Sequence, residues 1–255
     1  MASNTNSKDL PSHVVSSFNM HGFNQGLGCL NSLCNTQELF SDIIFIQEHW
    51  LSPSNMHKIL SNSANYSAYG ISAMEECLSK GVLKGRPWGG VCTIVNNKFQ
   101  SSVKVLKCAE RFVVIEIGEM LFINVYLPKI CNEYDYSIVH EIFIEIESLF
   151  MVNPSRSIII GGDFNARLDV KSPSSDYLNS FLENFGVIPC HKLISSNLNY
   201  TFHRDATSQF SYIDYICISK GYADSLVNFK VQDVFHNLSD HLPISAQFNL
   251  KFSLK

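Results

Sequence analysis

Acidic, amide and imidazole side chains stand at the ends of apolar runs in this sequence. The run IIFIQEHW reaches Glu48, SIIIGGDFNAR reaches Asp163 and Asn165, and NLSDHLPI presents Asp240 and His241 just before another apolar run. Strand ends are rigid and can aim such side chains into one cleft. Carboxylates and amides are the oxygen ligands that Mg²⁺ prefers, and an imidazolium can stabilise the charge that develops when a phosphodiester is attacked.

Three further polar residues close or interrupt apolar runs. Asn19 closes the run that ends in SSFN, Tyr126 closes FINVY, and Asp214 lies inside SYIDYI. A carboxylate in an apolar strand is costly to bury unless it is paired, and His241 is the expected partner of Asp214. Such a carboxylate fixes the tautomer of the imidazole and favours its charged form. The alternative is an Asp214 that only hydrogen-bonds a neighbouring loop.

Each of these residues also has a plain structural explanation. Glu48 can cap the turn that follows its strand, Asp163 and Asn165 can be turn formers beside two glycines, and Asp240 can open a strand before Pro243. Five independent turns would then all have to favour acidic or amide residues at strand ends. The combined pattern therefore favours one shared site.

The segments GGDFNAR, SYIDYI and SDHLPI, in this order and with Asn19, Glu48 and Tyr126 upstream, resemble the exonuclease–endonuclease–phosphatase superfamily. This superfamily includes DNase I, abasic-site endonucleases, deadenylases, inositol polyphosphate 5-phosphatases and neutral sphingomyelinases. Within it, DFNAR at 163–167, RPWGG at 86–90, YTF at 200–202 and SDHLPI at 239–244 most resemble the endonuclease domains of LINE-type (non-LTR) retrotransposons. The resemblance extends from about Val14 to Phe248. It implies a four-layer α/β sandwich, in which two facing mixed β-sheets are flanked by helices.

The resemblance implies a divalent metal, Mg²⁺ or alternatively Mn²⁺. Glu48 matches its main carboxylate ligand, with Asn19 beside it and Asp240 as a further acidic residue near the metal. Abasic-site repair enzymes carry an aspartate two residues after the asparagine, where this sequence has His21. That difference puts a second carboxylate contact in doubt and argues against a repair enzyme.

The resemblance also implies the catalytic roles. Asp163 matches the residue that orients or deprotonates the attacking water. Asn165 and Tyr126 match groups that contact the phosphate. Asp214 and His241 match a coupled pair that stabilises charge on the scissile phosphate.

Contacts to DNA are expected from four residues in particular: Arg167, Thr201, Ser211 and Arg86. Arg167, four residues after Asp163, is the best candidate for a phosphate neighbour, although any single cation can equally be a solvated surface residue. Other cations expected to support DNA binding are Lys80, Lys84, Arg111, Lys129, Lys192 and Arg204. Trp88 can either pack in the core or support a loop near DNA, and we expect core packing.

The elements that must position these residues can be placed from the apolar periodicity. Strands are predicted at His13–Phe18, Asp42–Ile46, Val91–Val95, Phe112–Ile117, Leu121–Tyr126, Ser157–Ile160, Tyr212–Ile218 and Leu242–Asn249. Helices are predicted at Gly28–Phe40, Ser54–Ser61, Asn132–Phe150 and Ser175–Phe185.

Composition fits one large α/β domain. The 255 residues are 45% hydrophobic and 16% charged, so a sizeable core can form, and we expect a lead-in at 1–12 and one domain at 13–255. The net charge of −4 is not that of a strongly basic nucleic-acid binder, so either the chain binds no nucleic acid or an acidic metal pocket offsets a local basic rim.

The eight cysteines include no C-x-x-C pair, which argues against a zinc site. The sequence shows no signal peptide and no run long enough to span a bilayer.

These observations predict a metal-dependent endonuclease that nicks double-stranded DNA and leaves a 3′-hydroxyl to prime reverse transcription. We expect it to act in the nucleus, after synthesis in the cytoplasm, beside a reverse transcriptase domain of a longer protein. As an isolated domain it is expected to be a monomer. The alternatives are another substrate for the same site (RNA for a deadenylase, abasic DNA, an inositol phosphate or sphingomyelin) and an inactive binding module. The intact set of polar residues argues against inactivity.

Overall fold

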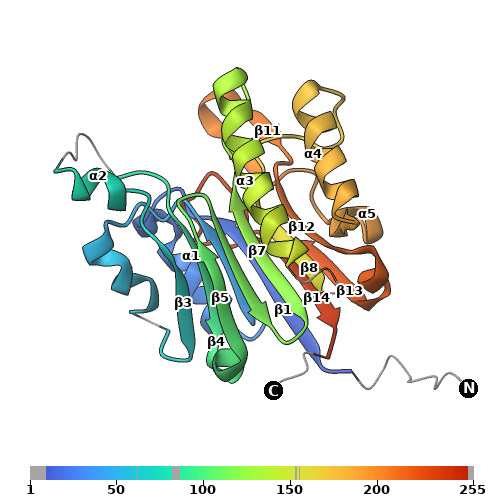
Figure 1. Cartoon of the computed structure of the whole chain (residues 1–255). Coiled ribbons are helices and arrows are strands. Elements are labelled where there is room, and N and C mark those ends of the chain that lie inside the picture. The colour runs from blue at the N-terminus through green and yellow to red at the C-terminus, as the bar shows by residue number, and fades with distance from the viewer. Residues whose placement is uncertain (1–9, 62, 82–86, 153, 155, 252–255) are drawn as a thin grey trace, which may run out of the picture.

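Two facing six-stranded β-sheets form the centre of the molecule in the computed structural model, which describes residues 10–61, 63–81, 87–152, 154 and 156–251 (Figure 1). The first sheet has the order β13 (Leu226–Val231), β14 (Ile244–Asn249), β1 (Ser12–Asn19), β2 (Ile43–Gln47), β4 (Val91–Asn96) and β3 (Tyr66–Ile71). The second has the order β5 (Val103–Cys108), β6 (Phe112–Ile117), β7 (Met120–Tyr126), β8 (Ser157–Asp163), β12 (Asp214–Ser219) and β9 (Val187–Pro189). A separate hairpin joins β10 (Phe202–Arg204) to β11 (Gln209–Ser211).

Both sheets are mixed, with one parallel pair near the centre of each. β1 runs parallel to β2 in the first sheet, and β7 runs parallel to β8 in the second. The register places Tyr126 beside Asp163 and Asp163 beside Asp214, so three predicted site residues lie side by side on neighbouring strands. In the first sheet Asn19 lies beside Gln47, which brings Asn19 to the same edge as Glu48.

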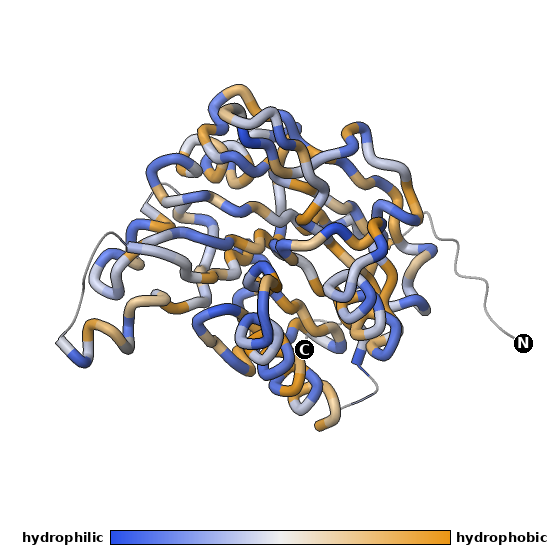
Figure 2. The backbone as a smooth tube through the Cα atoms, turned by 90° about the horizontal axis from the view of Figure 1, so that it is seen from above, coloured by the Kyte–Doolittle hydropathy of each residue, from blue (hydrophilic) through white to orange (hydrophobic). Residues whose placement is uncertain are grey.

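Alternating residues of the strands divide the core into layers. In β2, Ile43 and Phe45 belong to the core between the sheets, whereas Ile44 and Ile46 pack on the outer side with Leu33. Successive side chains of a strand point to opposite faces of its sheet, so a strand that is buried on both faces contributes alternate residues to two cores. Seen from above, hydrophobic and hydrophilic stretches alternate along the chain (Figure 2).

Helices cover the outer faces and complete the predicted four layers. α1 (Phe23–Asn35) packs on the first sheet. α3 (Glu133–Met151) and α4 (Pro173–Asn184) lie over the second sheet (Figure 1). The shorter helices are η2 (Pro53–Leu60), α2 (Glu75–Ser79), η3 (Asn97–Ser102), α5 (Cys190–Leu193), η4 (Asp205–Thr207) and η5 (Lys220–Ser225). Among the helices of the described residues, none is both long and apolar enough to cross a membrane.

All eight predicted strands are present, but four details of the prediction are wrong. α1 begins at Phe23 and ends at Asn35, five residues earlier than expected, and the helix predicted at 54–61 is 3₁₀. Ser12 already belongs to β1, so the lead-in predicted at 1–12 is too long; residues 1–9 lie outside the described part of the chain. The sequence does not predict the edge strands β3, β5 and β13 or the three-residue strands β9, β10 and β11.

A buried amide joins the two sheets beneath the edge where the site residues gather. Asn124 of β7 accepts a hydrogen bond from Nε2 of Gln47 at 2.7 Å. Its own Nδ2 donates to the carbonyl oxygens of Ile46 at 3.2 Å and Cys92 at 3.0 Å. Asn124 is fully buried, so water could not replace these three hydrogen bonds if the amide were removed.

Replacing this amide tests its structural role. We expect Asn124→Leu to lower the free energy of unfolding by roughly 2–4 kcal/mol, because the Gln47 amide would keep only its bond with Ser17 and two buried carbonyls would each lose a hydrogen bond. Urea denaturation followed by circular dichroism measures the change. Gln100→Leu, at an exposed amide of η3, is the matched control and should change it by less than about 0.5 kcal/mol. Equal effects of the two variants would contradict the account.

Candidate active site

One asparagine side chain joins the two sheets at the site. Nδ2 of Asn19 donates to Oε1 of Glu48 and to Oδ2 of Asp163, both at 2.9 Å. Glu48 follows β2 of the first sheet and Asp163 ends β8 of the second, so residues 115 positions apart converge on one amide. The other oxygen of Glu48 accepts a hydrogen bond from the indole N–H of Trp50 at 3.1 Å. The carboxylate is therefore held from both sides.

The backbone is strained at this edge. Among the described residues, five other than glycine have positive φ, and four of them belong to site segments: His21, Glu48, Trp50 and Asn165, with φ between 46° and 52°. Left-handed backbone is unfavourable for such side chains and persists only where the surrounding contacts impose it. The strain turns the chain sharply after β1, β2 and β8 and presents the side chains at the edge.

Asp163 is almost completely buried and is held by its neighbour Asn165. The backbone N–H of Asn165 donates to Oδ1 of Asp163 at 2.8 Å, and its side-chain Nδ2 donates to Oδ2 at 3.2 Å and to the carbonyl of Leu127 at 2.9 Å. Burial and then the charge of Asp214 raise the pKa of Asp163 to about 7, although His241 opposes this. A carboxylate that titrates near neutrality can exchange a proton with water. In this arrangement Asn165 orients Asp163, and its amide N–H groups do not point to a phosphate.

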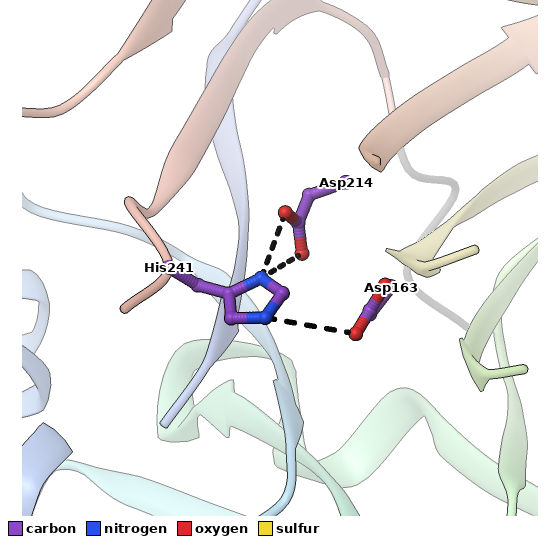
Figure 3. A group of neighbouring side chains, drawn as sticks. All are labelled: Asp163, Asp214 and His241. Atoms are coloured by element: carbon purple, nitrogen blue, oxygen red, sulfur yellow. Dashed lines mark hydrogen bonds and ion pairs between the residues drawn. The ribbon is translucent and has the colours of Figure 1, made fainter. Parts of the chain in front are cut away.

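The predicted Asp214–His241 pair is present. Nδ1 of His241 lies 3.0 Å from Oδ2 and 3.2 Å from Oδ1 of Asp214, and Nε2 faces Oδ2 of Asp163 at 3.9 Å (Figure 3). The Thr201 hydroxyl donates to Oδ2 of Asp214 at 2.6 Å. The backbone N–H of His241 donates to the Ser239 hydroxyl at 3.1 Å. The ring is thus oriented with one nitrogen on Asp214 and the other toward the Asp163 carboxylate.

His241 carries its charge despite its burial. Burial alone would lower the pKa of His241, but the charge and hydrogen bond of Asp214, followed by the charges of Asp163 and Asp240, raise it to about 10. At neutral pH the ring is therefore an imidazolium that can donate from Nε2 toward an anion.

Asp240 is paired with the histidine that replaces the expected acidic residue. Nδ1 of His21 lies 3.0 Å from Oδ1 of Asp240, and Nε2 of His241 lies 4.0 Å from the same oxygen. Asp240 raises the pKa of His21 through this hydrogen bond. Burial alone would raise the pKa of Asp240, but His21 and His241 hold it below its usual value. The ring of His21 also packs on Trp50, with centroids 4.9 Å apart.

Tyr126 lies at the wall of the cleft between Glu48 and Asp163. Burial raises the pKa of Tyr126 well above its usual value, and the charges of Glu48 and Asp163 raise it further. The phenol therefore keeps its proton at any working pH and is able to donate a hydrogen bond to a phosphate oxygen, as predicted for this residue.

These residues open into a cleft of about 700 Å³ that has an acidic floor and cationic walls. Its floor includes Glu48, Asp163, Asp240 and His241. Its walls include the cations Lys129, Arg167 and Arg204. This separation of charge within one cleft agrees with a local basic rim that the net charge of the chain conceals.

Of the four predicted DNA contacts, two line the cleft. Arg167 lies in its wall, where its guanidinium forms two hydrogen bonds with Asp169, at 3.1 and 2.6 Å. Ser211 of β11 also lines the cleft. Thr201 does not fit the prediction, because its side chain is fully buried and its hydroxyl is bound to Asp214. It positions the aspartate instead. Arg86 lies outside the described residues.

The donor set fits a hard divalent cation on the Glu48 side of the cleft. Glu48 and Asp240 supply carboxylate oxygens there, and such cations prefer oxygen ligands. Among the described residues, Asp163, Asp214 and His241 also form a group whose ligand atoms lie within 4.8 Å of one another. In that group, however, Asp214 accepts a hydrogen bond from Thr201 and is paired with the His241 imidazolium, whose positive charge repels a cation. Asn19 directs its nitrogen at the two carboxylates, and its oxygen accepts a hydrogen bond from the backbone N–H of His21 at 3.0 Å, so in this arrangement the amide orients the carboxylates.

The chain belongs to the Endonuclease/Exonuclease/phosphatase family, which it matches over residues 16–241. No curated protein matches its sequence significantly. Similar solved structures include the 3′ phosphatase NExo from Neisseria bound to a product DNA hairpin, at 15% identity, with 92% of this chain and 99% of that chain covered and a TM-score of 0.69. Others are the AP endonuclease LMAP from Leishmania major, at 11% identity, 98% and 92% coverage and a TM-score of 0.72, and the endonuclease domain of TRAS1, a telomere-specific non-LTR retrotransposon, at 16% identity, 93% and 98% coverage and a TM-score of 0.65. These likenesses show the DNase I-like α/β sandwich, and the family match supports a hydrolytic nuclease or phosphodiesterase.

Three contributions were missed from the sequence alone. Trp50 binds the Glu48 carboxylate, Thr201 binds Asp214, and His21 binds Asp240. Each is a hydrogen bond or an ion pair with a charged residue, made from a neighbouring loop or strand. The sequence places Trp50 only two residues after Glu48, which is the one hint of the first contact. The contacts of Thr201 with Asp214 and of His21 with Asp240 join separate segments, and the sequence gives no hint of them.

The charge of His241 can be tested by nuclear magnetic resonance of the metal-free protein with labelled histidine rings. We expect His241 to titrate with a midpoint near 10, and in Asp214→Asn to fall below the ordinary value of about 6.5, because burial then acts without its main opposing charge. Because the pKa is raised in the folded state, the pair stabilises the fold fully below about pH 6.5, and this stabilisation is lost as pH rises toward 10.

His49 is the internal reference for that titration. Burial lowers the pKa of His49 to about 4, so its ring should stay neutral over the pH range in which His241 changes. A wild-type His241 that titrates near 6.5 would show that Asp214 does not hold its proton.

Proposed function

We propose that this chain is a divalent-metal-dependent endonuclease that nicks double-stranded DNA and leaves a 3′-hydroxyl. The observation that carries the proposal is the convergence of Glu48, Asp163 and the Asp214–His241 pair in one cleft that has cationic walls. We further propose that it is the endonuclease domain of a LINE-type retrotransposon. In that role it would act in the nucleus beside a reverse transcriptase domain, and the new 3′-hydroxyl would prime reverse transcription.

The protein's own side chains divide the work of hydrolysis. Asp163, with a pKa near neutrality, accepts a proton from the attacking water. The His241 imidazolium and the Tyr126 phenol donate to the oxygens of the scissile phosphate, where negative charge increases in the transition state. Glu48, with Asp240 beside it, would hold Mg²⁺ or Mn²⁺. When bound, the cation neutralises phosphate charge and supports the leaving oxygen.

A DNA substrate is supported by the charge distribution and by sequence. Lys129, Arg167 and Arg204 line the walls of the cleft and suit a phosphate backbone that extends past the scissile position. The segments DFNAR and SDHLPI resemble retrotransposon endonuclease domains, and the fold is similar to the TRAS1 endonuclease domain. His21, at the place of an acidic residue in repair enzymes, favours ordinary DNA over an abasic site.

Supercoiled plasmid tests this function directly. With Mg²⁺ or Mn²⁺ the protein should convert it to relaxed circles, and EDTA should abolish the reaction. His241→Ala should lower the rate by about 10²–10³-fold, because it removes one donor to the developing charge. Extension of the nicks by a DNA polymerase without prior treatment would identify the 3′-hydroxyl.

Glu48→Gln should reduce nicking at least as strongly, and Glu183→Gln, at an exposed carboxylate of α4, is its matched control. Relaxed circles that appear in EDTA, or a Glu48→Gln protein as active as the parent, would contradict the proposal. A duplex with one abasic site, tested in parallel, should be cut no faster than intact DNA.

A further inference from the structure

A second cavity lies on the other side of the Glu48–Tyr126 wall. Its volume is about 170 Å³, and it shares Glu48 and Tyr126 with the main cleft. Its remaining lining includes Trp50, Trp88 and Arg111. None of the roles proposed above for water, metal or phosphate uses this cavity.

Trp88 is held at this cavity and does not enter the core. The side chain is 40% exposed, which corrects the expectation of core packing. The carbonyl of Gly89 accepts a hydrogen bond from the backbone N–H of Trp50 at 3.0 Å. Gly89 and Gly90 both have positive φ, and a side chain at Gly90 would collide with the ring of His49. The loop that carries Trp88 is therefore anchored to the segment that carries Glu48.

His49 makes that anchor rigid. Its ring is fully buried, Nδ1 accepts a hydrogen bond from the backbone N–H of Leu51 at 3.1 Å, and Nε2 lies 3.2 Å from the carbonyl oxygen of Ile71. A neutral imidazole with Nε2 protonated satisfies both contacts. An exposed tryptophan on a fixed support, next to a catalytic cleft, is poised for a ligand.

The chemistry of the lining selects a flat, uncharged ring. Trp88 and Tyr126 supply aromatic surfaces, and the guanidinium of Arg111 lies 5.4 Å from the centroid of the Tyr126 ring. Aromatic rings and guanidinium planes are the groups on which nucleobases stack. Glu48 and Glu110 place carboxylates in the same lining, which disfavours a second phosphate there.

We propose that this cavity binds one nucleobase of the cut strand, from a nucleotide adjacent to the phosphate at Glu48. The inference rests on the proposed function and names a feature of its substrate. A base inside a duplex cannot reach the cavity without leaving its stack, and this costs least where the base is already unpaired. The enzyme should therefore prefer to cut beside unpaired or distorted positions.

The chain contains only two tryptophans, and both line this cavity. Intrinsic tryptophan fluorescence therefore reports on this cavity and, through Trp50, on the adjoining Glu48 and His21 of the main cleft, so a ligand that differs only in its bases is the necessary comparison. In EDTA, where no cleavage occurs, a thymidine octamer should quench the emission. An octamer with the same phosphates but with stable abasic residues in place of every nucleoside should not. Equal quenching by the two octamers would overturn the inference, because phosphate contacts alone would then explain binding.

Substitutions at Trp88 separate stacking from folding. By anisotropy of labelled octamers, Trp88→Ala should weaken binding of the thymidine octamer on the order of tenfold and leave the abasic octamer unchanged. Trp88→Phe should retain most of the affinity, since an aromatic ring remains. Tyr222→Ala, at an exposed aromatic of η5 beyond the far end of β12, is the matched control and should bind like the parent. The inference is wrong if Trp88→Phe and Trp88→Ala both keep the melting temperature of the parent and bind the thymidine octamer with the same affinity as each other.

Plasmid nicking by the same preparation distinguishes the two proposals. A protein that nicks plasmid but binds both octamers equally supports the nuclease and rejects the base-binding cavity. A protein that discriminates between the octamers but nicks nothing supports the cavity and rejects the nuclease. In an active protein, the preference for duplexes with an unpaired base should fall in Trp88→Ala.

Discussion

The site depends on the Asn19 amide, which holds together carboxylates from two different sheets. Its Nδ2 binds both Glu48 of the first sheet and Asp163 of the second. Its backbone carbonyl accepts a hydrogen bond from the Ser239 hydroxyl, which in turn accepts one from the N–H of His241. One buried residue thus determines the separation of the metal-side carboxylate, the water-side carboxylate and the imidazolium. Any change in how the sheets pack would move all three.

The same edge concentrates buried charge at a cost to stability. Asp163 and Asp214 are neighbours in register on paired strands, and each is only 1% exposed. Two adjacent carboxylates repel each other, and burial adds a desolvation cost that only specific partners can offset. His241 lies between them and Thr201 supplies a further donor to Asp214. As a result, at neutral pH Asp163 can accept a proton from water while His241 carries one that it can donate toward the phosphate.

Much of this could be predicted from sequence, because the central strands are strongly apolar and the polar residues stand at their ends. The edge strands β3, β5 and β13 could not, since at least half of the residues in each are exposed or half-buried and polar residues or glycine interrupt their apolar runs. The start of α1 was misplaced for a specific reason. Gly26 weakens the helical signal, yet it is required there, because a Cβ would lie 2.6 Å from the Met20 side chain. The support for Trp88 depends on His49 in another segment, so a tryptophan expected in the core lies exposed instead.

The central claim is that the cation belongs on the Glu48 side of the cleft, with Asp163 and His241 left free for water and phosphate. Anomalous X-ray diffraction from crystals soaked in Mn²⁺ tests it most directly. The account predicts a peak at ligand distance from a Glu48 oxygen, about 2.0–2.3 Å away, and clear of His241. A peak coordinated by Asp163, Asp214 and His241, with Glu48 unliganded, would contradict it.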